Sequence, residues 1–170
     1  MNEDKSRVDI KIGDREEYRT SSTWPYHVSC GGVVYRKNVD KIEVLLLGRG
    51  ADFNAALGRK SVESWHLPKG TLKYTETLVE GAIREVREEA GVEIEVEVYI
   101  GSRIADWVEA EIHYIKDHHY FLMKYLGEHV EPMDHEHEKK AWFPLDEADK
   151  IVEWDQEIIL RAKKALEKIV

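Results

Sequence analysis

The chain has 170 residues, a formal net charge of −9 and one cysteine, Cys30. Its length favours a single domain that is large enough to bury a hydrophobic core. The acidic balance makes nucleic acid an unexpected partner, because nucleic-acid binding needs a basic surface. No apolar run approaches the roughly 20 residues of a membrane span, so we expect no membrane partner. A lone cysteine cannot form an internal disulfide, which favours a reducing, cytoplasmic compartment.

The N-terminal part of the chain differs in composition from the rest. Residues 1–24 are polar and carry mixed charges, so we interpret them as an extension with at most a short strand at residues 8–12. Residues 25–170 alternate apolar runs with turn residues and contain no internal repeat or linker. We therefore expect one folded domain over residues 25–170.

The first half of this domain has the pattern of short strands. Two apolar runs, residues 26–35 and 42–47, flank turn residues and predict a β-hairpin. Residues 50–63 show no clear period and predict a loop. Pro68 limits the next strand to a few residues, because proline has no N–H for a strand or helix to use.

Residues 70–92 predict a turn followed by an amphipathic helix. Thr77 and Glu80 have the spacing of a capping box, and Gly91 is the residue type that tolerates the left-handed conformation just past a helix end. A stripe of apolar residues at helical spacing predicts the buried face: Val79, Ala82, Ile83, Val86 and Ala90.

Three glutamates, Glu85, Glu88 and Glu89, lie on another face of this helix, within about a quarter-turn of arc. Like charges this close repel one another unless a cation lies among them. Such carboxylates favour Mg²⁺, with Mn²⁺ as the alternative, because both are hard cations that prefer oxygen ligands. Gly81 lies one turn before Glu85 and is expected to leave room for a group to approach the helix. The alternative interpretation is a solvated acidic face.

The second half of the chain predicts more strands and then helices. Residues 92–100 and 104–114 predict a second hairpin with its tip at residues 113–119, where His113, His118 and His119 are interpreted as exposed loop residues. The remaining elements are a central strand at 120–125, a charged loop at 127–140, a strand at 141–145, a helical turn at 146–150 and a C-terminal helix over residues 158–169. This irregular alternation favours an α/β fold, an α/β/α sandwich around a mixed β-sheet.

The stretch from residue 70 to residue 92 resembles the signature of the Nudix hydrolase family. That signature is Gly, five residues, Glu, seven residues, Arg-Glu, an aliphatic residue, any residue, Glu-Glu, any residue, Gly and an aliphatic residue. The matching residues, with no departure, are Gly70, Glu76, Arg84, Glu85, Val86, Glu88, Glu89, Gly91 and Val92. The resemblance covers most of residues 26–168. It implies a Nudix-type α/β/α sandwich and metal-assisted hydrolysis of a phosphoanhydride bond.

The resemblance also implies roles for these residues. In the family, the glutamates that match Glu85 and Glu89 bind metal, as the one that matches Glu88 often does. The glycine that matches Gly70 offers its backbone carbonyl to the site. The arginine that matches Arg84 orients the first of these glutamates, while the glutamate that matches Glu76 is mainly structural.

A weaker sequence likeness points to one subgroup of this family. Residues 135–137, followed by Trp142, and residues 65–70 are similar to segments of animal-type diadenosine tetraphosphate hydrolases. This implies that Glu136 lies in the active site and contributes to metal binding or base catalysis. The general base stays open among four glutamates: Glu85, Glu88, Glu136 and Glu138.

Two further residues are candidates for substrate binding. Lys69 directly precedes the turn at Gly70 and could contact a phosphate. Tyr120 could stack on adenine, with core packing as the alternative. The expected substrate is a small nucleotide, a dinucleoside polyphosphate such as diadenosine tetraphosphate. ADP-ribose and an oxidised nucleoside triphosphate are alternatives, and a non-catalytic nucleotide-binding regulator is the alternative of another class. The oligomeric state, monomer or homodimer, stays open.

Overall fold

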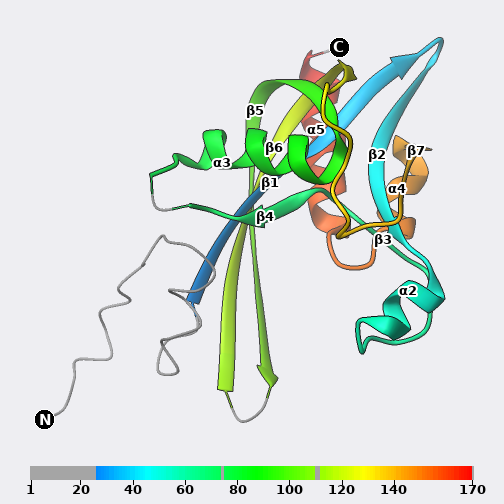
Figure 1. Cartoon of the computed structure of the whole chain (residues 1–170). Coiled ribbons are helices and arrows are strands. Elements are labelled where there is room, and N and C mark those ends of the chain that lie inside the picture. Colours follow the sequence, from blue (N-terminus) through cyan, green and yellow to red (C-terminus); the bar gives the residue numbers. More distant parts are fainter. Residues whose placement is uncertain (1–25, 74, 110–111, 170) are drawn as a thin grey trace, which may run out of the picture.

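The computed structural model describes residues 26–73, 75–109 and 112–169, and the predicted extension with its strand at 8–12 lies outside them. These residues form the following elements: β1 (Tyr26–Asn38), β2 (Lys41–Arg49), α2 (Ala51–Ala56), β3 (Ser64–His66), β4 (Lys69–Thr71), α3 (Leu78–Ala90), β5 (Val92–Glu109), β6 (Ile112–Glu128), β7 (Lys139–Pro144), α4 (Leu145–Ile151) and α5 (Gln156–Ile169). Figure 1 shows their arrangement. None of the helices within the described ranges is both long and apolar enough to cross a membrane.

The strands form one mixed sheet. The order is β3-β2-β1-β6-β5, with β4 paired to β1 and β7 paired to β2. β1 and β6 run parallel, whereas the other pairs are antiparallel. The predicted hairpin of β1 and β2 is confirmed, and the predicted central strand at 120–125 belongs to β6, which lies between β1 and β5.

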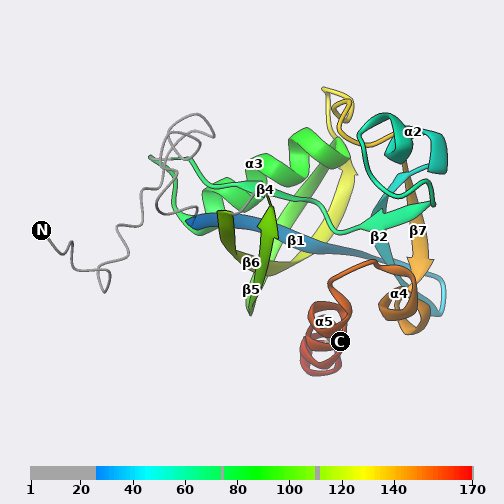
Figure 2. The ribbon, with the colours of Figure 1, turned by 90° about the horizontal axis from the view of Figure 1, so that it is seen from below.

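Helices cover both faces of this sheet. Figure 2 shows α3 on one face and α4 and α5 on the other. The alternation along β1 accounts for these two layers, because successive side chains of a strand point to opposite faces. Val28, Cys30 and Val34 pack on the α3 side, whereas Val33 and Tyr35 pack on the side of α4 and α5. The predicted α/β/α sandwich with a mixed sheet is therefore confirmed.

The predicted loop at residues 50–63 contains a short helix, α2. Its Asn54 is buried, and the side-chain amide of Asn54 donates to the carbonyl of Val62 at 2.7 Å and to the hydroxyl of Ser64 at 3.0 Å. These bonds fold the segment back onto β3. Six residues are too few for an apolar period to reveal a helix.

The predicted hairpin tip at residues 113–119 is wrong. β5 and β6 continue to pair out to Glu109 with Ile112, so the three histidines lie within β6. Figure 1 shows the two strands extending from the body of the molecule as an arm. Because an arm has exposed faces, it tolerates the polar residues that we interpreted as a loop. His118, in contrast to that interpretation, is buried.

Candidate active site

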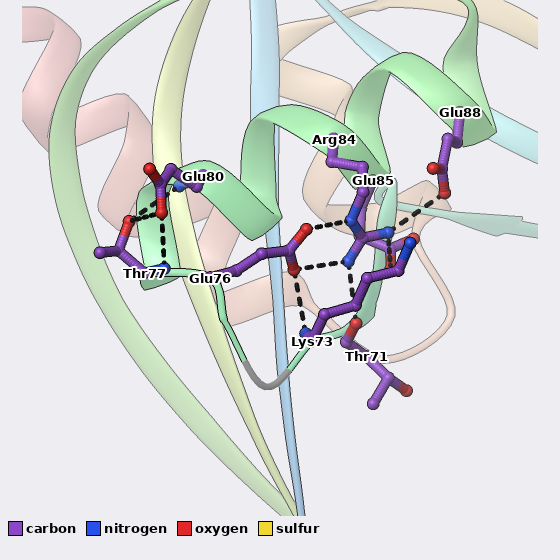
Figure 3. Close-up of polar contacts among 8 residues, drawn as sticks. All are labelled: Thr71, Lys73, Glu76, Thr77, Glu80, Arg84, Glu85 and Glu88. Carbon is purple, nitrogen blue, oxygen red and sulfur yellow. Dashed lines mark hydrogen bonds and ion pairs between the residues drawn. The ribbon is translucent and has the colours of Figure 1, made fainter. Parts of the chain in front are cut away.

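The ends of α3 follow the sequence pattern. The carboxylate of Glu80 accepts the backbone N–H of Thr77 at 2.8 Å, and the Thr77 hydroxyl accepts the backbone N–H of Glu80 at 3.3 Å. This capping box, visible in Figure 3, is the predicted one. At the other end Gly91 adopts the left-handed conformation, with φ of 63°. The local sequence thus places the start and end of the helix that carries the three glutamates.

Gly81 serves packing inside the domain. A Cβ at this position would lie 2.6 Å from the Leu72 side chain and 2.7 Å from Cys30 Sγ. The group that approaches the helix here is therefore the protein's own core, and not a ligand as the sequence suggested. The close contact holds α3 against β1 and the segment after β4.

Arg84 is the centre of a network of carboxylates (Figure 3). Its guanidinium donates to Glu85 at 2.7 Å, to Glu88 at 3.1 Å and to both carboxylate oxygens of Glu76. A further bond at 3.0 Å reaches the carbonyl of Thr71. The bonds from Arg84 lower the pKa of Glu76. Arg84 therefore orients Glu85, and Glu76 ties the preceding loop to the helix, as the resemblance implies.

β4 lies directly against the carboxylate of Glu85. A Cβ at Gly70 would lie 2.1 Å from Glu85 Oε2, so no side chain fits there. The same strand reaches the second buried glutamate, because the backbone N–H of Lys69 donates to Glu89 Oε2 at 2.9 Å. The fold thus brings Gly70, Glu85 and Glu89 together.

Glu89 is only 5% exposed. This burial raises the pKa of its carboxyl group to about 8; the bond from the Lys69 N–H opposes the rise, and the nearby charges of Glu85 and Glu136 add to it. A buried carboxylate beside two others is unfavourable unless a cation compensates it. The environment of Glu89 therefore fits a cation at this face.

The oxygen ligands of this face suit Mg²⁺, but they are not preassembled. Within the described ranges, no three His, Cys, Asp or Glu side chains already converge closely enough to hold a metal ion. Glu85 and Glu88 both point their carboxylates at Arg84. Since the ligand type and the burial of Glu89 fit a hard cation, these residues would hold it after a rearrangement of side chains.

The loop between β6 and β7 brings a fourth glutamate to this face. Arg49 Nε donates to the carbonyl of Glu136 at 2.9 Å, and the N–H of Asp134 donates to the carbonyl of Glu88 at 2.8 Å. The side chain of Glu136 is exposed, and its charge contributes to the raised pKa of Glu89. Glu138 makes a different contact: its carboxylate accepts the backbone N–H of Gly50 at 2.5 Å.

The two predicted substrate contacts differ in their surroundings. The Lys69 ammonium lies 3.7 Å from the carboxylate of Asp155, which also accepts from Arg103 at 2.8 Å. Tyr120 is fully buried in the core on the side of α4 and α5. The ring cannot stack on a base from that position, so the predicted adenine contact is wrong and the packing alternative holds.

Three residues near this face received no role from the sequence: Arg49, His66 and His137. His66 and His137 lie within the two segments that resemble diadenosine tetraphosphate hydrolases. The two imidazoles are buried, and their ring centres lie 5.9 Å apart. Burial, reinforced by nearby cations, lowers the pKa of each to about 3, so both are neutral at physiological pH. The only sequence feature that points to Arg49 is its position as a charged residue at the end of a buried strand.

The mixed α/β fold and the glutamate-bearing helix α3, which packs beside Gly70 of β4, are the features that identify the protein family. The NUDIX domain model matches residues 25–162, so the chain belongs to the NUDIX family and carries a NUDIX hydrolase domain. The protein named MutT4 from Mycobacterium tuberculosis (strain CDC 1551 / Oshkosh) is 34% identical over 128 residues. That match includes 72% of this chain and 48% of MutT4, so the chain spans about half the length of this curated relative.

Solved structures share the fold. The Ap4A hydrolase of C. elegans, in a binary complex, superposes with a TM-score of 0.62 and 25% identity over 84% of this chain and 98% of its own. The NUDIX domain of Shewanella oneidensis NrtR, complexed with ADP ribose, superposes with a TM-score of 0.61 and 18% identity over 90% of this chain and 99% of its own. The second likeness shows the fold alone.

Proposed function

We propose that this chain hydrolyses a phosphoanhydride bond in a nucleoside diphosphate-linked substrate with Mg²⁺, and that the substrate is a dinucleoside polyphosphate such as diadenosine tetraphosphate. The observation that carries the proposal is the buried pair Glu85 and Glu89 beside Gly70, with Arg84 orienting Glu85. Family membership supports the reaction type. The likeness to an Ap4A hydrolase structure supports the substrate class.

Each residue then has a chemical task. Glu85, Glu88 and Glu89 are the proposed metal ligands, with the carbonyl of Gly70, and Mn²⁺ is the alternative ion. The cation supplies charge neutralisation and a more acidic bound water. Lys69, whose ammonium is partly exposed, is the proposed phosphate contact.

Four glutamates are candidates for the general base: Glu85, Glu88, Glu136 and Glu138. Glu138 already accepts a backbone N–H, and both Glu85 and Glu88 accept bonds from Arg84. Glu136 has an exposed side chain beside Glu89 and a backbone that Arg49 holds in place. Because Glu136 lies in the segment that resembles diadenosine tetraphosphate hydrolases and its charge acts on Glu89, we favour Glu136 as the base or as an added metal ligand, with Glu88 as the alternative.

The test is a substrate panel with the purified full chain and Mg²⁺. Diadenosine tetraphosphate, ADP-ribose, nucleoside triphosphates and an oxidised nucleoside triphosphate are compared by chromatography of the products. We expect the highest kcat/KM for the dinucleoside polyphosphate. No turnover of any of these substrates would contradict the hydrolase proposal, and a preference for ADP-ribose would contradict the substrate class.

One variant separates an enzyme from a non-catalytic regulator. Glu89→Gln keeps the size of the side chain and removes its charge, so we expect kcat to fall by at least about 100-fold while nucleotide binding persists. Glu147→Gln, on the exposed side of α4, is the matched control and should retain wild-type activity. Wild-type binding without turnover would instead favour the regulator.

A further inference from the structure

The segment between β6 and β7 is attached to the C-terminal end of α3. The N–H of His129 donates to the carbonyl of Gly91 at 2.9 Å, and the N–H of Asp134 donates to the carbonyl of Glu88 at 2.8 Å. The approach is close, because a Cβ at Gly91 would lie 2.5 Å from the backbone nitrogen of Met133. The segment therefore follows the end of the helix that carries the glutamates.

The same segment is attached to the end of β2 just before β7 begins. The N–H of Glu138 donates to the carbonyl of Gly48 at 3.1 Å, and the carboxylate of Glu138 accepts the N–H of Gly50 at 2.5 Å. His137, directly before Glu138, is buried. Residues 134–138 thus connect the end of α3 to the end of β2, and we call them the bridge.

Glu136 lies in the middle of the bridge, where side chains hold both of its backbone polar groups. Asp134 Oδ1 accepts the N–H of Glu136 at 3.0 Å, and Arg49 Nε donates to the carbonyl of Glu136 at 2.9 Å. Because the N–H of Asp134 donates to the carbonyl of Glu88, Asp134 also connects Glu136 to α3. The charge of Glu136 acts on Glu89 and helps to raise its pKa. The backbone of Glu136 is therefore fixed from two elements at once, while the residue itself is exposed.

Stability gives little reason for the two bonds to Glu136. Both bonds lie at an exposed part of the chain, where water could replace either side chain. A hydrogen bond in such a place contributes about 1 kcal/mol or less to the free energy of unfolding. What the two bonds add is orientation, because a functional carboxylate on a loop needs neighbours that hold its backbone in place.

We infer that Asp134 and Arg49 are positioning residues that hold Glu136 at the carboxylate face, which is the side of α3 that carries the three glutamates. The inference rests on the proposed function and deepens it. Asp134 acts from the side of α3 and Arg49 from the end of β2. Both act through Glu136, and neither is assigned a contact with the substrate or the metal ion.

Steady-state kinetics of Asp134→Ala, with and without Glu136→Gln, test the side of α3. For diadenosine tetraphosphate we expect Asp134→Ala to lower kcat at least about tenfold with KM within about twofold of wild type. In the Glu136→Gln background the same substitution should lower kcat by less than about a further twofold, because no carboxylate is left to position. Equal losses in the two backgrounds, or wild-type kcat in Asp134→Ala, would overturn the inference.

Two further variants of aspartates make this result specific. Asp134→Asn keeps a side-chain oxygen that accepts the N–H of Glu136, so we expect it to retain at least about half of the wild-type kcat. The matched control is Asp146→Ala on α4, whose exposed carboxylate pairs with Lys163 and should leave the kinetics unchanged in both backgrounds. A loss in Asp134→Asn as large as in Asp134→Ala would contradict a role through this acceptor.

Arg49 tests the inference from the other end of the bridge, which keeps it testable if Asp134→Ala does not fold. Arg49→Lys keeps the positive charge but loses the Nε donor to the carbonyl of Glu136. We therefore expect Arg49→Lys to lower kcat about as much as Arg49→Gln, and both losses to shrink below about twofold in the Glu136→Gln background. Wild-type kcat in Arg49→Lys would mean that the charge suffices, and it would overturn the positioning role of Arg49.

Amide hydrogen exchange makes the result independent of turnover. In NMR spectra of the metal-free full chain, the N–H of Glu136 should exchange at least about tenfold faster in Asp134→Ala than in wild type or Asp134→Asn, while the amides of β1 keep their rates. An unchanged rate at Glu136 would overturn the inference even if hydrolysis is found. Faster exchange at Glu136 without turnover of any substrate in wild type would support the positioning contacts and count only against the proposed function.

Discussion

At the scale of single residues, the glutamates on one helix face have different environments. Glu88 is exposed, Glu85 is held by Arg84, and Glu89 is buried with one backbone N–H as its partner. Burial of Glu89 next to other negative charge makes its proton hard to lose. Of the three glutamates, Glu89 is therefore the one whose raised pKa brings its change of protonation close to neutral pH.

Glu89 predicts a pH-dependent stability of the metal-free protein. The pKa of its carboxyl group is about 8 when folded, against 4.5 as the reference value. The folded state thus binds more protons between these values, so the free energy of unfolding should fall as pH rises through that window. Thermal unfolding in EDTA at pH 6 and pH 8 should show the lower Tm at pH 8, and Mg²⁺ should raise Tm more at pH 8.

Glu89→Gln provides the check on this assignment. The variant has no carboxyl group at position 89, so the difference in Tm between pH 6 and pH 8 should shrink. Glu147→Gln should keep the wild-type difference. A variant at position 89 with the full pH dependence would assign the effect to another group.

At the scale of elements, α3 depends on its first turn. Thr77 and Glu80 satisfy backbone groups that a helix start leaves unpaired. The loop before it is held by Glu76, which accepts from the backbone N–H of Lys73 at 2.9 Å as well as from Arg84. The position of the glutamates therefore depends on polar contacts at the helix start as well as on the apolar stripe.

Thr77→Ala should destabilise the fold by about 1 kcal/mol, because it removes the side-chain acceptor of the capping box. Urea unfolding followed by circular dichroism measures the change in the free energy of unfolding. Thr75→Ala, two residues earlier at an exposed position, is the control and should cost much less. Equal losses in both variants would mean that the cap contributes nothing specific.

At the scale of the whole molecule, one sheet connects the two sides of the site. β1 pairs with β2, β4 and β6, so it fixes the strand of Lys69 and Gly70 relative to the end of β2 at Arg49. A Cβ at Gly31 of β1 would lie 2.1 Å from the carbonyl oxygen of Pro68, so β4 approaches too closely for any side chain. This central strand therefore holds β4, which borders the carboxylate face, next to β2.

The domain boundary gives a prediction at the same scale. The described core clusters consist of residues from Val28 onward, and the NUDIX domain model begins to match at residue 25. We propose that residues 1–24 are an extension, so a chain of residues 25–170 should fold and keep its Tm within about 3 °C of the full chain. Calorimetry of both chains measures this. A much lower Tm would make the N-terminal residues part of the domain.

Local pattern alone determined the signature helix, its two ends, the first hairpin and the α/β class, because capping, helical period and strand alternation depend on residues near one another in sequence. The same pattern misplaced the histidines of β6, since a paired arm tolerates polar residues. The sequence pattern also did not decide whether Tyr120 contacts the substrate or packs in the core. Burial depends on what the rest of the chain places around a side chain, and only the tertiary structure settles it.

The residues of the proposed site also form two groups, those placed by local sequence and those placed by long-range contacts. Glu85, Glu88 and Glu89 share a helix face by spacing alone, so the sequence by itself determined the carboxylate cluster. Arg49 reaches the loop of Glu136 only in the folded chain, where its Nε donates to the carbonyl of Glu136, 87 residues away in sequence. Residues that are distant in sequence can act together only after such long-range contacts form, so the tertiary structure alone decided which loop borders the cluster.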